Sequence, residues 1–200
     1  MRQPRSLTAR LVVLALAFGG AFGATSPGAW AAQADDIEAR GSFQFSTAPG
    51  ILPTWNSQDL RLSGLSPATT LTNVGLGTVA VTLPVVARNG TATATAGGFR
   101  ILNVDEQRSV ICANPVVDTR ALVIDCVVPG RGNMQLFAIT SFDARSTSTT
   151  SSTQTQRFEG VDFRVASSAM ADYLNDTLQT NVFSPYVTLG SGTLTVTSAR

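Results

Sequence analysis

The 200-residue chain contains no histidine and no lysine. Without histidine there is no Ser-His-Asp or Cys-His catalytic set, no histidine metal site and no histidine-ligated haem. Without lysine there is no Schiff-base chemistry, no Ser-Lys dyad and no P-loop lysine to reach a phosphate. No glycine-rich loop opens a helix either. These absences exclude the commonest catalytic mechanisms and leave nucleotide binding unsupported.

The sequence has only two cysteines, too few and too far apart for a structural zinc site. Cys112 and Cys126 each lie in a strand-like run, and turn residues stand between the two runs. A hairpin centred near Thr119 would place the cysteines opposite each other, with Cα atoms about 4.5 Å apart. In an exported chain this spacing predicts a Cys112–Cys126 disulfide, whose loop closure would add about 3 kcal/mol of stability. Two free buried thiols are the alternative.

The long apolar run lies near the N-terminus, over residues 11–24, and is followed by small residues and by Ala29-Trp30-Ala31, which fits the A-x-A cleavage pattern. Three arginines precede it: Arg2, Arg5 and Arg10. This order predicts a secretory signal peptide over residues 1–31, with a second possible cut before Asp35. A transmembrane anchor is the alternative, but this run is shorter than the ~20 residues that cross a bilayer. No membrane span is expected in the mature chain.

Removal of the signal peptide would leave 11 basic residues against 13 acidic ones, a formal charge of −2. Such a balance lacks the excess of basic residues that binding to nucleic acid or to an anionic membrane requires. The remainder has the size of one domain. We expect it to be secreted or at the cell surface, or periplasmic if the envelope has an outer membrane.

Apolar and polar residues alternate along most of the mature chain, the pattern of β-strands. Residues 32–40 are expected to form a mobile leader and residues 41–200 a single β-rich domain. Asn89-Gly90 predicts a hairpin with a type I′ turn, which needs φ > 0 at both residues. The expected fold is mainly all-β, an antiparallel β-sandwich or rolled sheet with one short C-terminal helix. Two short strands, near residues 182–187 and 192–197, are expected to close the chain.

Residues 144–156 are rich in serine and threonine and offer nothing apolar to bury. They are expected to form an exposed loop or the tip of a solvated hairpin, and a glycosylated or adhesive loop is the functional interpretation. A strand pattern resumes from Phe158 to Val165, and the helix is predicted after it, with Ser168 as its N-cap. Its buried face is expected to carry Met170, Tyr173, Leu174 and Leu178.

Paired carboxylates are the catalytic chemistry that these absences leave open. Glycosidases need two carboxyl groups about 5–10 Å apart. Candidate pairs are Asp118 with Asp125 and Glu159 with Asp162, although 13 acidic residues offer such pairs by chance. Trp55 is the one tryptophan beyond the signal peptide that could stack on a sugar. No catalytic, cofactor-binding or metal-binding residue is therefore predicted.

Other residues have a functional and a structural interpretation. Asn89 and Asn175 each begin a glycosylation sequon, yet a turn residue and a helix residue are the favoured assignments. Tyr173 and Tyr186 are chemically able to ligate iron as phenolates, but core or interface positions are favoured.

The C-terminal third carries Ala171-x-x-Leu174-Asn175-x-x-Leu178-x-Thr180-x-x-Phe183, followed by Leu189-Gly190 and Thr193-Leu194-Thr195-Val196. With Gly97-Gly98-Phe99-Arg100, these residues resemble secreted actinobacterial β-rich proteins related to the haem-transport-associated (HtaA-type) domain. The resemblance implies a secreted or surface β-rich domain. Haem-binding members use a tyrosine near the domain start, supported by histidine. Because no tyrosine precedes Tyr173 here and histidine is absent, the resemblance implies a relative without the haem site.

The function expected is an exported, non-catalytic β-domain that acts at or outside the cell surface as a structural or binding module. A surface-layer or fibre subunit and an adhesive domain both fit this description, and self-association is a possible mode of action. The alternative is a carrier for a small hydrophobic or haem-like ligand, and a carboxylate-based glycosidase comes third. No cofactor is expected.

Overall fold

The computed structural model describes residues 36–200, so the predicted signal peptide lies outside the described residues. Thirteen strands and two helices follow one another in this part of the chain: β1 (Ile37–Thr47), α1 (Ile51–Asn56), β2 (Leu60–Leu65), β3 (Thr69–Asn73), β4 (Thr78–Asn89), β5 (Ala92–Thr95), β6 (Gly98–Asn103), β7 (Arg108–Asp118), β8 (Val123–Val128), β9 (Gly132–Ser141), β10 (Ala144–Thr149), β11 (Thr153–Glu159), β12 (Asp162–Val165), α2 (Ser168–Leu178) and β13 (Thr188–Ala199). Residues 37–40, expected in a mobile leader, belong to β1, because Ile37 and Glu38 already pair with Arg88 and Ala87 of β4.

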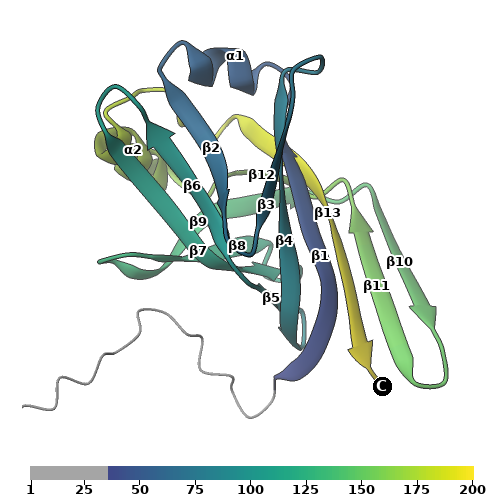
Figure 1. Ribbon diagram of the computed structural model, residues 1–200. Coiled ribbons are helices and arrows are strands. Elements are labelled where there is room, and N and C mark those ends of the chain that lie inside the picture. The colour runs from purple at the N-terminus through teal and green to yellow at the C-terminus, as the bar shows by residue number, and fades with distance from the viewer. Residues whose placement is uncertain (1–35) are drawn as a thin grey trace, which may run out of the picture.

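Eight antiparallel strands close into a barrel in the order β1-β4-β5-β7-β8-β9-β12-β13, and β13 pairs back onto β1. Figure 1 shows these strands wrapped around one interior. The rolled sheet of the sequence-based prediction is therefore present in closed form, and the sandwich alternative is wrong. The reason is the pairing of the first strand with the last, over nine residue pairs from Ala39↔Ser198 to Thr47↔Gly190.

The remaining strands extend the barrel wall. Strand β3 pairs with β4, the β2–β6 pair joins β7, and β11 pairs with β13 and carries β10. Strand β13 is long enough to pair with β12 near its start and with β11 along the rest of its length. The β10–β11 hairpin consequently extends to one side of the barrel (Figure 1). The result is a continuous outer sheet in the order β3-β4-β1-β13-β11-β10.

Two predicted segments differ from the structure. Residues 144–156 form strand β10, a turn and the start of β11, so the hairpin alternative is correct and the loop is not. All six residues of β10 are exposed, as expected for a stretch with nothing apolar to bury. Residues 182–187 are not a strand: the chain turns there, with the Tyr186 amide donating to Ser184 Oγ at 3.2 Å. Strand β13 alone closes the chain.

Aromatic side chains fill the barrel interior. The rings of Phe45, Phe99, Phe137 and Phe163 contact one another with centroids 5.3–5.9 Å apart. An eight-stranded barrel is just wide enough for side chains to fill it. The cavity left beside these rings measures about 20 Å³ and is also lined by Trp55 of α1, which is 3% exposed.

Helix α2 packs on β7 and β12 through Ala171, Leu174 and Leu178, all of them buried. Leu174 and Leu178 of the predicted face are buried as expected, whereas Met170 and Tyr173 are only partly buried and Ala171, which was not predicted, is buried. The N-cap lies one residue earlier than predicted, because Ser167 Oγ accepts from the Met170 amide at 3.2 Å. Among residues 36–200, no helix combines the length and the apolar character that a bilayer span requires.

Both predicted hairpins are present, each with a local difference. Asn89 is the last residue of β4 and pairs with Ala92, so the turn is Gly90-Thr91 and only Gly90 has positive φ (58°). The Cys112–Cys126 disulfide links β7 and β8 with Cα atoms 4.9 Å apart. Its cysteines are not register partners: the antiparallel pair is Ala113↔Val127, so Cys112 and Cys126, which each precede one of these residues, face each other diagonally.

Candidate functional site

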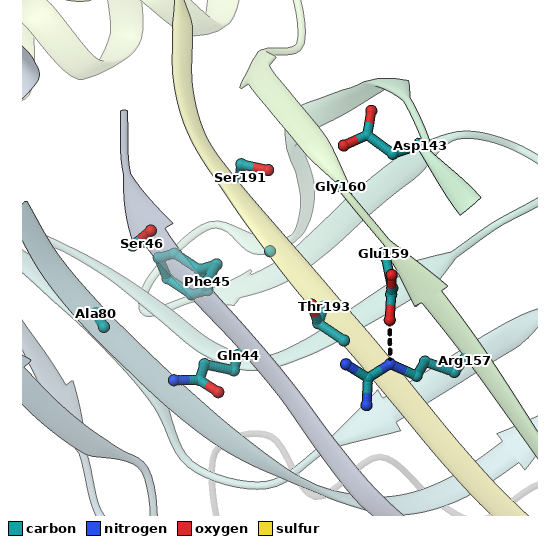
Figure 2. Close-up of a pocket in the computed structure, with 11 residues that line it drawn as sticks. Gln44, Phe45, Ser46, Ala80, Asp143, Arg157, Glu159, Gly160, Ser191 and Thr193 are labelled. Atoms are coloured by element: carbon teal, nitrogen blue, oxygen red, sulfur yellow. Dashed lines mark hydrogen bonds and ion pairs between the residues drawn. The ribbon is translucent and has the colours of Figure 1, made fainter. Parts of the chain in front are cut away.

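A concavity of about 530 Å³ lies on the outer wall of the barrel, across β4, β1, β13 and β11 (Figure 2). We call it the polar trough. Its lining consists mainly of hydroxyl, amide and charged side chains with small residues between them: Gln44, Phe45, Ser46, Ala80, Asp143, Arg157, Glu159, Gly160, Ser191, Gly192 and Thr193.

Strand alternation decides which side chains reach the trough. Phe43 and Phe45 of β1 point into the core, so Gln44 and Ser46, which alternate with them, point outward. The antiparallel register then sets Gln44 opposite Thr193 of β13 and Ser46 opposite Ser191. Figure 2 shows Thr193 between Gln44 on one side and the charged residues of β11 on the other. The trough is thus built by pairing between the two ends of the domain.

The floor of the trough is low because its residues are small. Ala80 pairs with Ser46 across β4 and β1, and neither side chain rises far above the sheet. At Gly192, an added Cβ would lie 2.6 Å from the carbonyl oxygen of Gln44, so any larger residue would push the two strands apart. The close approach of the strands therefore requires glycine at this position.

Charged residues form the far wall. Arg157 Nε donates to Glu159 Oε1 at 2.6 Å within strand β11, and these side chains are 52% and 49% exposed. Asp143 precedes β10, and its amide donates to the Glu159 carbonyl at 2.9 Å. Gly160 has φ of 60°, and the Asp143 carboxylate occupies the space that a Cβ there would need. The wall thus presents one guanidinium and two carboxylates to the solvent.

The predicted pair Asp118 and Asp125 lies elsewhere, on the β7–β8 hairpin. Asp118 Oδ1 accepts hydrogen bonds from Thr91 Oγ1 (2.9 Å) and from the amides of Arg120 (2.8 Å) and Ala121 (3.0 Å). Burial by itself would raise the pKa of the Asp118 carboxyl. These hydrogen bonds and the charge of Arg120 together outweigh burial, so the pKa of Asp118 is lowered. Burial, then the charge of Asp118, raises the pKa of Asp125. Three hydrogen bonds to one carboxylate oxygen give Asp118 the role of holding the turn together.

The second predicted pair is divided between two environments. Glu159 faces the polar trough, whereas the Asp162 carboxylate accepts from Ser141 Oγ at 3.2 Å on strand β9. The acidic neighbour of Glu159 in the trough is Asp143, which no sequence motif singled out. Trp55 is buried in the core, so it does not offer an exposed ring to a sugar.

The two tyrosines lie apart from the trough. Tyr173 on α2 lines a second concavity of about 510 Å³, beside β7 and the β8–β9 turn. The guanidinium of Arg131 lies over its ring, with Cζ 5.4 Å from the ring centroid. Tyr186, which follows α2, is 83% exposed. The two residues are not brought together into one site.

The two asparagines that begin glycosylation sequons, Asn89 and Asn175, lie where the sequence analysis favoured, at a strand end beside a turn and in a helix. Asn175 Nδ2 donates to the Phe183 carbonyl and its Oδ1 accepts from the Phe183 amide, both at 3.0 Å. This side chain therefore folds the segment after α2 back onto the helix. Asn89 ends strand β4 beside its turn. In the part of the chain that the structure describes, no three His, Cys, Asp or Glu side chains gather as a metal site would require.

Comparison with known proteins gives a match in structure alone. No protein-family model matches the chain, and no curated protein matches its sequence. Solved structures with a similar fold include the haem-binding protein HtaB from Corynebacterium glutamicum, at 12% identity and a TM-score of 0.50, covering 82% of this chain and 95% of that one. The C-terminal domain of HtaA from the same organism aligns at 7% identity and a TM-score of 0.44, covering 80% of this chain and 98% of that one. The resemblance to HtaA-type domains seen in the sequence is confirmed as a likeness of fold.

Proposed function

We propose that this protein is an exported, non-catalytic binding module that acts at or outside the cell surface and holds neutral, polyhydroxylated chains in the polar trough. Carbohydrate polymers have this chemistry. The observation that carries the proposal is the lining itself: amide, hydroxyl, guanidinium and carboxylate groups stand in register on one open face.

A sugar hydroxyl both donates and accepts hydrogen bonds, so its binding site must offer both kinds of group. Gln44, Ser46, Ser191 and Thr193 each supply a donor and an acceptor, while Arg157 donates and Glu159 accepts. The low floor of Ala80 and Gly192 leaves room for a chain to cross the strands. Binding by hydrogen bonds alone, without a stacking ring, should be of modest affinity because each bond contributes only ~1 kcal/mol.

The geometry favours binding over hydrolysis. A glycosidase needs a general acid held in an environment that keeps it protonated. Glu159 instead is ion-paired with Arg157, and its side chain is 49% exposed to solvent. Its role in the proposal is to orient Arg157 and to accept a hydroxyl hydrogen bond.

A carrier of a haem-like molecule is compatible with the shared fold, but the residues of this chain do not fit haem. The barrel interior keeps only about 20 Å³ beside the phenylalanine rings, far too little for a porphyrin. Tyr173 is the sole strong iron ligand beside its concavity, and Arg131 places a positive charge over its ring. No histidine exists in the chain to assist it.

Calorimetric titration of the mature protein with a panel of neutral oligosaccharides and with polygalacturonate tests the proposal. We expect saturable binding to at least one neutral member, weaker binding to the acidic polymer, and release of no reducing sugar. Thr193→Val and Gln44→Ala should each weaken binding about fivefold, the loss of one hydrogen bond. Thr72→Val, at an exposed site on β3 that does not line the trough, is the matched control and should bind as wild type. Absence of binding across the panel, or hydrolysis of the ligand, would overturn the proposal.

A further inference from the structure

The turn between β3 and β4 exposes large apolar side chains. It comprises Val74-Gly75-Leu76-Gly77, and Val74 and Leu76 are 87% and 71% exposed. Turns of this kind normally carry Gly, Asn, Asp, Ser or Pro, because exposing large aliphatic groups to water is unfavourable. We call Val74 and Leu76 the apolar tip.

Hydrogen bonds fix the shape of the turn, and this shape keeps the side chains of the apolar tip exposed. The Leu76 amide donates to Asn73 Oδ1 at 3.0 Å, and the Gly77 amide donates to the Val74 carbonyl at 3.3 Å. Gly77 takes φ of 59°, which a side chain would disfavour. Val74 and Leu76 are thereby kept pointing away from the sheet instead of folding back onto it.

The hairpin that carries the apolar tip is free of charge. No charged residue occurs between Arg61 and Arg88, the whole stretch that contains the hairpin. The segment after α2 reaches the same end of the barrel, because the Val79 amide donates to Thr47 Oγ1 (3.1 Å) and the Ala48 amide donates to the Leu189 carbonyl (2.8 Å). That segment is likewise uncharged from Thr177 to Ala199.

The same segment adds exposed Tyr186 (83%) and Val187 (43%) to this end. Tyrosine combines an apolar ring with a polar hydroxyl, the composition favoured where hydrocarbon meets water. A protruding neutral turn and an exposed tyrosine at the same end of the barrel are suited to an interface between an apolar medium and water.

We propose that the apolar tip inserts shallowly into the surface of a lipid layer. A protein partner would cover one side of a protruding turn, whereas fluid lipid surrounds it, and the exposed fractions of Val74 and Leu76 (87% and 71%) leave most of each side chain to be covered. Insertion is limited to the headgroup and upper acyl region, because the turn carries backbone groups that hydrocarbon would leave without partners. With no basic residue at the tip, binding does not depend on anionic lipid. This proposal stands apart from ligand binding in the polar trough.

Vesicle co-sedimentation of the mature protein tests the proposal. We expect equal binding to phosphatidylcholine vesicles and to vesicles with about a quarter phosphatidylglycerol, with no loss in about 0.5 M NaCl. The double variant Val74→Ser/Leu76→Ser should reduce the bound fraction at least about tenfold. Val86→Ser removes an aliphatic side chain that is 46% exposed farther along β4 and should leave binding unchanged.

A second readout locates the inserted residue. Val74→Trp should shift its fluorescence to the blue on adding vesicles and be quenched by brominated acyl chains, whereas Val86→Trp should do neither. Failure of the wild type to bind vesicles, equal binding by the double variant, or binding that requires anionic lipid and is lost in salt would each overturn the proposal. Self-association that the double variant abolishes, without vesicle binding, would assign the tip to a second copy of the chain instead.

Discussion

Cys112 and Cys126 are joined by a disulfide across the β7–β8 hairpin, and both residues are buried in the barrel wall. Because the bond closes a loop in the unfolded chain, replacing both cysteines with alanine should lower the free energy of unfolding by about 2–4 kcal/mol. Urea denaturation of the oxidised wild type and the double variant measures the difference. The unreduced protein, once unfolded in urea, should also take up no alkylating reagent, and full labelling at both positions would contradict the bond.

Asp118 and Asp125 should make opposite contributions to the pH dependence of stability. The pKa of Asp118 is lowered by folding, so its contribution is present above its unfolded value and is lost as pH falls through the folded value. The pKa of Asp125 is raised, so this residue opposes folding increasingly as pH rises from its unfolded value through its folded value. Urea denaturation across the acidic range should therefore show Asp118→Asn losing stability towards neutral pH, and Asp125→Asn gaining it.

The interaction between these carboxylates has a direct readout. Since the Asp118 charge is the second cause of the raised pKa of Asp125, Asp118→Asn should bring the Asp125 pKa down part of the way, with the effect of burial remaining. Titration of the carboxyl carbons by NMR measures this. An Asp125 pKa that is unchanged in the variant would show that burial alone sets it.

Helix α2 should contribute to stability through the face that packs on the barrel. Leu174 is fully buried, so Leu174→Ala should cost about 2–5 kcal/mol through lost burial and a new cavity. Asp172→Ala, on the exposed side of the same helix, is the control and should stay within about 0.5 kcal/mol. Thermal and urea melts of the two variants test this. A Leu174 variant as stable as the wild type would show that the helix does not support the core.

Hemin should bind the mature protein weakly and without saturation. The barrel interior is filled, and Tyr173 has Arg131 over its ring and no histidine to assist it. Absorption titration across the Soret and visible bands of haem measures the binding. A sharp Soret band at equal stoichiometry, lost in Tyr173→Phe and kept in Tyr186→Phe, would contradict the account and identify the ligand.

Local patterns predicted the local structure of this chain. The alternation of Phe43 and Phe45 with polar neighbours, the Asn89-Gly90 turn signal and the spacing of Leu174 and Leu178 each specify one element, because each depends on neighbouring residues only. Closure of the barrel was not predictable in this way. It depends on β1 pairing with β13, which no short-range signal records.

The polar trough could not be predicted from the sequence for the same reason. Gln44, Thr193 and Arg157 come from three strands far apart in the sequence, and only the registers β1–β13 and β13–β11 bring them together. Helix α1 was missed because six residues containing Pro53 show no helical period. The leader was predicted to extend to residue 40, past the start of β1 at Ile37, because the polar start of this strand gives little alternation before Phe43.

The central claim is that the polar trough binds a neutral, hydroxyl-rich chain. Amide chemical shifts of ¹⁵N-labelled mature protein, recorded while an oligosaccharide from the panel is added, test it most directly. The account predicts saturable shifts clustered on Gln44, Ser46, Arg157, Ser191 and Thr193, with Asp118, Asp125 and the α2 amides unchanged. Shifts centred on the Tyr173 concavity, or scattered without saturation, would contradict it.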